Sequence, residues 1–271
     1  MKKAIATVMK YLVPFCSLAL CAQLSFAAAD TLSASAADAL LKKVDANTAF
    51  MGTDFSANYT LVQDKPGQGK DTTTAVMFRR DDADSYTILI TGPASDKGKG
   101  YVKFDQTIWY YDPKDRQFEA FSASRKLVGT NATAGDLSPQ TFSKDYKIKS
   151  AAKVKLGKLD CVLFDLNAKG SGVAYPSIKL WVTADDGLIR KREDYSLSGQ
   201  ILRTTAIPSY QKFGGHSVPE KMVIVDNLRG KKINNKMQYE QTQVTVSNVS
   251  FTKQSNTVYT KKYVEMQGNT K

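Results

Sequence analysis

Apolar and polar side chains alternate in strand-length runs through most of this chain, and this pattern constrains the fold more than any other feature. Successive side chains of a β-strand point to opposite faces, so alternation predicts strands with one buried face and one exposed face. Phe55, Ala57, Tyr59 and Leu61 share one face of the first such run. The pattern therefore predicts a mainly β protein built on an antiparallel sheet.

Turn-forming residues separate the predicted strands closely enough for antiparallel hairpins and meanders. Asp64–Gly69 is expected to form the first hairpin loop, and Asp112–Asp115 a later turn. The last run is long and mostly polar, so we expect it to be a solvated outer or edge strand. The predicted strands cover residues 53–61, 71–80, 86–91, 99–105, 107–112, 117–121, 154–156, 161–167, 178–183, 189–196, 201–210, 221–226 and 235–249.

Three segments are expected to differ from this strand pattern. Residues 36–44 repeat apolar side chains at helical spacing behind Ser35, a suitable cap, and predict a helix that packs on the sheet. Residues 122–144 are rich in glycine and polar side chains, with a short helix expected from Ser138. A loop of this length is either a lid or binding loop or a disordered segment, and the sequence leaves both open. Residues 255–265 predict a short terminal helix.

Residues 1–27 have the organisation of a cleaved signal peptide, with early lysines, an apolar run and small residues near the cleavage point. Pro14 interrupts the apolar run, which is also shorter than the roughly 20 residues that span a bilayer. We therefore expect an exported, periplasmic protein. A lipid anchor at Cys21 is not expected, because the bulky Leu20 precedes the cysteine.

The remaining residues, 28–271, are expected to form one domain. Cleavage removes three lysines and no acidic residue, so the formal charge falls from +12 to +9. Cys161 then becomes the only cysteine, which excludes an internal disulfide. Its apolar neighbours indicate a small buried side chain rather than a reactive thiol. A chain of this length can be stabilised by its own core, without bridges.

Motifs for catalysis or metal binding are missing from the sequence. His216 is the only histidine, so neither a zinc site nor a Cys/His nucleophile is supported. There is no Gly-x-Ser-x-Gly elbow and no P-loop, and the acidic turns at residues 81–84 and 185–187 lack the other ligand positions of a calcium loop. We predict no enzyme activity, no catalytic residue, no metal and no cofactor.

The basic residues are spread along the chain rather than gathered into one stripe. Together with the export signal, this argues against a nucleic-acid partner. The clusters Arg190–Arg192 and Arg229–Lys232 are either solvated faces or contacts for anionic lipid headgroups or an acidic partner surface.

Several short motifs resemble the outer membrane lipoprotein-sorting protein family, which is similar to the periplasmic lipoprotein carrier LolA. They include Leu40–Asn47, Gly92–Ala94 followed by Lys97–Gly98, Ile108–Pro113, Gly135–Ser138 and the ending from Val246. The resemblance covers nearly all of residues 28–271. It implies a strongly curved antiparallel sheet that forms an unclosed half-barrel, with an N-terminal helix and short helices over the concave face.

The same resemblance implies an apolar cavity that shields acyl chains and an arginine beneath a lid. The middle loop departs from the family because Leu127–Ala134 is polar and small rather than methionine-rich. Arg79 and Arg80 are the candidates for a headgroup or lid contact. The residues expected to line the cavity are Met77, Leu89, Phe104, Trp109, Tyr111, Phe118, Phe121 and Trp181. A filled core would use the same aromatic residues and would leave no room for a lipid.

The predicted function is a periplasmic carrier, expected to be a monomer, that sorts or transfers a lipid or acylated lipoprotein to the outer membrane. Its partners would include an inner-membrane transporter or an outer-membrane receptor. The alternative is a lipid-sensing regulatory module, or an accessory protein of a lipid-exporting transporter, with the same fold. An exported esterase is a more distant alternative. The cargo is not encoded in any motif of the sequence.

Overall fold

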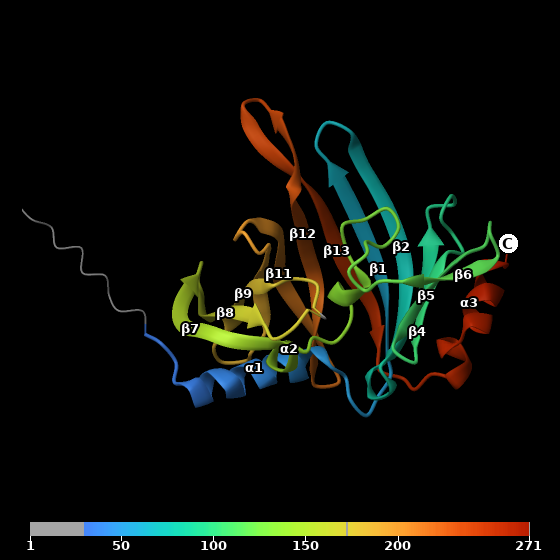
Figure 1. The fold of residues 1–271 in the computed structure, drawn as a ribbon. Coiled ribbons are helices and arrows are strands. Elements are labelled where there is room, and N and C mark those ends of the chain that lie inside the picture. Colours follow the sequence, from blue (N-terminus) through green and yellow to red (C-terminus); the bar gives the residue numbers. More distant parts are fainter. Residues whose placement is uncertain (1–29, 172, 271) are drawn as a thin grey trace, which may run out of the picture.

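The computed structural model describes residues 30–171 and 173–270. The predicted signal peptide and Cys21 lie outside the described residues. Thirteen strands form one antiparallel sheet in the order β6-β5-β4-β3-β2-β1-β13-β12-β11-β10-β9-β8-β7. β6 and β7, the two ends of this order, do not pair with each other within the described residues, so the sheet is an unclosed half-barrel (Figure 1).

Most strands lie close to their predicted positions, but β7 begins eight residues before the predicted 154–156 and β12 extends beyond the predicted 221–226 at both ends. The first half of the sheet contains β1 (Phe55–Lys65), β2 (Gly69–Arg80), β3 (Ser85–Gly92), β4 (Gly100–Phe104), β5 (Thr107–Asp112) and β6 (Gln117–Phe121). The second half contains β7 (Tyr146–Leu156), β8 (Leu159–Ala168), β9 (Ser177–Thr183), β10 (Ile189–Tyr195), β11 (Ile201–Phe213), β12 (His216–Ile233) and β13 (Lys236–Ser250).

The N-terminal helix α1 (Ala34–Thr48) covers part of the concave face. Its cap is Ser33, whose hydroxyl accepts a hydrogen bond from the Ala36 amide at 3.3 Å. Leu41 and Val44 are almost fully buried and pack in the same core cluster as inward-facing residues of the sheet, such as Phe55. The predicted amphipathic helix is therefore confirmed, starting two residues earlier than expected.

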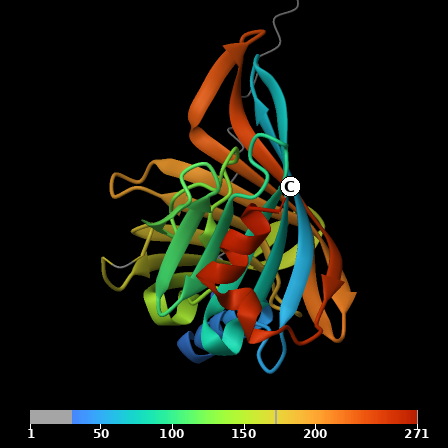
Figure 2. The same cartoon turned by 90° about the vertical axis from the view of Figure 1, so that its right-hand side faces the viewer.

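The C-terminal helix α3 (Lys261–Gly268) covers the opposite, outer face of β3, β4 and β5 (Figure 2). Val264 packs there in a separate small cluster with Val102 and Tyr111. The expectation that the short helices cover the concave face does not hold for α3, because the outward residues of these strands are apolar too. α3 thus covers the outer face of this half of the sheet, whereas α1 contacts β7 and β12 in the other half.

The prediction of an edge strand at the C-terminal end is wrong. β13 lies in the middle of the sheet, paired with β1 on one side and with β12 on the other. The buried residues Thr242, Val244 and Val246 lie in its second half. Its first half extends past the hydrophobic core and is mostly exposed. The polar first half explains why the run resembles a solvated strand.

Residues 122–145 do not leave the domain as a free loop. They cross the concave side and contain the single-turn helices η2 (Ala134–Asp136) and α2 (Phe142–Asp145), and η3 (Asn256–Tyr259) precedes α3. The apolar side chains of this crossing segment join the main core: Leu127, Ala132, Ala134, Leu137 and Phe142.

Within residues 30–171 and 173–270, no helix has the length and apolar character needed to cross a membrane.

Candidate functional site

A cavity of about 100 Å³ lies between the C-terminal end of α1 and the concave face of the sheet. Alternate residues of β1, β11, β12 and β13 point into it, because strand periodicity puts every second side chain on the inner face. Phe50, in the loop after α1, closes one end. The apolar residues that line the cavity include Val44, Phe50, Phe55, Tyr59, Leu137, Phe142, Leu188, Ile189, Ile207, Val218, Met222 and Val246.

A second cavity, of about 540 Å³, lies on the other side of the crossing segment and has a more polar lining. The two cavities share Asp136, Ser138, Gln140, Phe142 and Arg192. The short stretch Asp136–Phe142, here called the dividing segment, is therefore the wall between an apolar compartment and a polar one.

Arg79 on β2 binds the dividing segment through its guanidinium group. Its guanidinium donates to the Leu137 carbonyl at 3.1 Å and to the Thr48 carbonyl at 2.9 Å. It also forms an ion pair with Asp81 at 2.6 Å, and both side chains are almost fully buried. The cation lies 4.9 Å from the centre of the Phe50 ring, which favours burial of the charge.

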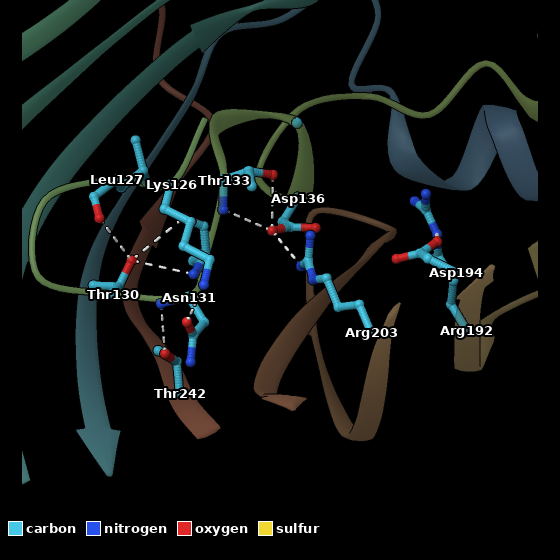
Figure 3. A network of polar contacts seen from close by, with 12 residues as sticks. Lys126, Leu127, Thr130, Asn131, Thr133, Asp136, Arg192, Asp194, Arg203 and Thr242 are labelled. Carbon is cyan, nitrogen blue, oxygen red and sulfur yellow. Dashed lines mark hydrogen bonds and ion pairs between the residues drawn. The ribbon is translucent and has the colours of Figure 1, made fainter. Parts of the chain in front are cut away.

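A second buried ion pair holds the same segment from the sheet. Arg203 on β11 lies 2.6 Å from the Asp136 carboxylate, which also accepts a hydrogen bond from the Thr133 amide (Figure 3). Burial is the largest single influence and lowers the pKa of the Arg203 guanidinium, but Asp136, Tyr175 and Asp194 together raise this pKa above its ordinary value. Arg203 therefore stays charged and keeps Asp136 fixed.

Two further contacts complete the wall. Arg192 on β10 forms an ion pair with Asp194 and donates to the Gln140 side-chain oxygen at 3.2 Å. The Gln140 amide donates to the Thr48 hydroxyl at 2.8 Å.

The earlier part of the crossing segment is bound by a polar cluster on β1 and β13. The Asn131 amide donates to the Thr242 hydroxyl at 2.9 Å and to the Gln63 side-chain oxygen at 3.0 Å (Figure 3). Lys126 forms an ion pair with Asp226 on β12 at 2.7 Å. Neutral hydrogen bonds at Asn131 and one ion pair at Lys126 therefore bind this part to the sheet.

The structure places most of the predicted cavity residues away from the cavity. The set on the outer face, packed with or beside α3, comprises Leu89, Phe104, Trp109, Tyr111 and Phe118. Trp181 also points outward on β9, under the ammonium group of Lys191 at 4.5 Å. Four of the aromatic residues, Phe104, Trp109, Tyr111 and Phe118, therefore share the face under α3, whereas Phe121 packs on the other face.

The remaining predicted residues divide between the two faces. Met77 is fully buried in the concave core, and Phe121 lines the polar cavity. Arg79 lines the apolar cavity, whereas Arg80 points outward and pairs with Asp54 at 2.7 Å. Adjacent residues of one strand face opposite sides, so only one of the two arginines can lie beneath the crossing segment.

Sequence reasoning missed the residues that line the apolar cavity. Phe55 and Tyr59 were available from the alternation of the first strand, whose inner face they share. Val218 was hidden because β12 begins five residues before the predicted strand, whereas Met222 lay inside that strand but was not assigned to a cavity. The signal that could have found them is the alternation of Val218, Met222 and Ile224 on one face.

Comparison with known proteins gives a family and a fold. A family model described as "Uncharacterized protein" matches residues 82–266. No curated protein matches the chain. The chain is similar to a LolA superfamily protein from Nitrosomonas europaea, with a TM-score of 0.69 and 22% identity over 84% of this chain and 98% of that chain.

Two other solved structures are similar over most of their length. A putative outer membrane lipoprotein-sorting protein domain from Vibrio parahaemolyticus has a TM-score of 0.72 and 16% identity over 84% of this chain and 97% of that chain. A DUF1329 family protein from Desulfovibrio piger has a TM-score of 0.71 and 15% identity over 85% of this chain and 98% of that chain. At these identities the likeness establishes a shared fold.

Proposed function

We propose that this chain, which belongs to the family matched over residues 82–266 and has the LolA-superfamily fold, is a periplasmic carrier of acylated cargo. The observation that carries the proposal is the apolar cavity on the concave face, closed by a segment that ion pairs and hydrogen bonds hold in place. Such a site can hold an acyl chain without any bond being made or broken.

The size of the cavity decides how an acyl chain would enter. An apolar cavity of about 150 Å³ is large enough for benzene. The apolar cavity here, about 100 Å³, is smaller and would take only a few carbon atoms of an acyl chain. Binding of a long chain therefore requires the dividing segment to move, which would join the apolar cavity to the polar one.

The energies permit this movement. Five contacts link the dividing segment to the sheet and to α1. Arg79 donates to Leu137, Arg203 forms an ion pair with Asp136 and Arg192 donates to Gln140, while the Phe142 amide donates to the Asp45 carboxylate and the Gln140 amide to the Thr48 hydroxyl. Their loss would cost about 7–13 kcal/mol, taking about 1.5–3 for each of the four charged contacts and about 1 for the neutral one. Burial of about 14 methylene groups contributes roughly 10 kcal/mol before the chain is ordered. An acyl chain of this length thus contributes about as much as release of the segment costs, whereas a short apolar molecule contributes too little.

In this proposal the acyl chain occupies the apolar cavity, and the polar part of the cargo lies in the second cavity or outside it. The cargo would be received from an inner-membrane partner and passed to an acceptor at the outer membrane. The inner-membrane partner and the outer-membrane acceptor are both part of what we propose.

The test is uptake of a fluorescent fatty-acyl probe by a variant with a filled cavity. Val218→Phe adds a ring to the cavity lining and should lower probe affinity at least tenfold. Leu163→Phe is the matched control, because Leu163 is half-buried on the outer face beside Trp181. Thermal unfolding of both variants must stay close to that of the original chain. Equal probe affinity in Val218→Phe and Leu163→Phe would rule out this cavity as the binding site.

A further inference from the structure

The end of the β12–β13 hairpin projects beyond the core of the sheet, beside the end of the β1–β2 hairpin (Figures 1 and 2). Residues Leu228–Tyr239, here called the hairpin tip, are exposed throughout except for the half-buried Ile233. A tight turn at Asn234 and Asn235 joins the strands, and both asparagines have positive φ angles, of 48° and 61°. The tip thus stands free of the core that stabilises the rest of both strands.

A change of register separates the tip from the sheet. Asp226 pairs with Glu240 and Gly230 pairs with Tyr239, so three extra residues lie on β12 between these pairs. Extra residues of this kind bend a strand and change its twist. The bend lies where the two strands leave the core, and Leu228 is one of the three extra residues.

Large apolar side chains gather on this exposed tip. Leu228 is 57% exposed, Met237 55% and Tyr239 39%. Met237 and Tyr239 share one face of β13 and lie over Gly230, where a Cβ atom would come within 2.9 Å of the Met237 sulfur. The glycine therefore lets both side chains lie flat on one face of the ribbon, in contact with solvent.

The same 12 residues carry four basic side chains and no acidic one: Arg229, Lys231, Lys232 and Lys236. The three lysines form no ion pair with any described residue. Arg229 lies 3.8 Å from Asp226 and 3.9 Å from Glu240 at the base of the tip, where Lys126 also pairs with Asp226. The tip is therefore both apolar and strongly positive.

We propose that the hairpin tip docks on an anionic membrane surface. Basic side chains attract anionic lipid headgroups, and a tyrosine with neighbouring apolar side chains suits the boundary between headgroups and acyl chains. Lys231 and Lys232 are successive residues of one strand and point to opposite faces. A folded partner that met one face would leave charge on the other unmatched, whereas a fluid bilayer surrounds the tip on both faces.

This docking surface is separate from the proposed cargo site. No residue of the tip lines the apolar cavity, which contacts the opposite end of β12 through Val218 and Met222. Docking and acyl binding can therefore be tested independently, and failure of one leaves the other standing.

The experiment is co-sedimentation of the protein lacking residues 1–27 with two kinds of vesicle, one of phosphatidylcholine alone and one with equal parts of phosphatidylglycerol. The charge variant is Lys231→Gln/Lys232→Gln/Lys236→Gln, and the apolar variant is Leu228→Ser/Met237→Ser/Tyr239→Ser. The matched control is Lys144→Gln/Lys147→Gln/Lys158→Gln, which removes three exposed lysines elsewhere on the surface. Acyl-probe uptake and thermal unfolding report whether each variant is folded.

The original chain should bind the anionic vesicles and not the neutral ones, with affinity that falls as salt is raised. Each basic residue near an anionic surface is worth about fivefold, so the charge variant should lose roughly a hundredfold. The apolar variant should lose at least tenfold, while the control stays near the original value. Equal binding to both vesicle types, binding retained in the charge variant, or an equal loss in the control overturns the proposal. Capture of an acidic protein with no vesicle binding also overturns it.

Discussion

Arg79 offers the most direct perturbation of the wall between the two cavities. Its guanidinium donates to two carbonyls and to Asp81, and the Asp81 carboxylate also accepts from the Phe50 amide at 2.8 Å. Arg79→Met removes the cation and leaves the almost fully buried Asp81 with one donor. Loss of one partner from a buried ion pair costs about 3–5 kcal/mol. We therefore expect the free energy of unfolding to fall by that amount.

Urea unfolding measures this loss, with two variants as references. Arg125→Met breaks a surface pair with Glu119, in which both side chains are more than half exposed, and should cost at most about 1 kcal/mol. Arg79→Met/Asp81→Asn should regain part of the loss, because the buried site no longer contains an unpaired carboxylate. The same variants report on function, since Arg79→Met frees the Leu137 carbonyl and should speed acyl-probe uptake.

Two results would refute this reasoning. An unfolding free energy for Arg79→Met within about 1 kcal/mol of that for Arg125→Met would mean that the buried pair does not anchor the segment. Unchanged uptake kinetics in a folded Arg79→Met variant would mean that the dividing segment does not control entry.

The remaining predictions concern the outer face. Hydrogen bonds from Arg80 lower the pKa of Asp54, so this carboxyl contributes stability above its unfolded pKa of about 3.9 that is lost as pH falls through the lower folded pKa. Asp54→Asn should cost about 1–3 kcal/mol at neutral pH and flatten the acid limb of stability against pH, measured by urea unfolding; an unchanged acid limb would contradict this. Trp109→Ala removes the ring that lies 3.1 Å below the Lys261 ammonium and should cost about 2 kcal/mol without changing acyl-probe affinity. Loss of probe binding in a folded Trp109→Ala variant would instead indicate that Trp109 lines the binding site.

The strands could be predicted because each carries its own alternation and ends at a turn-forming residue. The bounds of β5 and β6 follow the sequence pattern without error. The prediction ended β12 at Asp226 because Asp226–Arg229 form an irregular, mostly polar stretch. The strand continues through this stretch. The pairing of β13 could not be predicted, because a polar half-strand gives no information about its neighbours.

The site was harder to predict than the fold, for a physical reason. Alternation assigns Trp109 and Tyr111 to the same face, but it does not say which helix covers that face. Both faces of β3–β5 are covered in the structure, so apolar side chains occur on each and the cavity side has no distinct pattern. Arg79 and Arg80 illustrate the same difficulty. Strand geometry predicts that they point to opposite faces, but only the folded structure shows that Arg79 is the one that points inward.

Native mass spectrometry with lipid extraction, on protein purified from its own cells, is the most direct measurement of the central claim. The account predicts one acylated molecule per chain, retained by the original protein and absent from Val218→Phe. A chain that is consistently free of lipid and that also fails to take up fatty-acyl probes would contradict it.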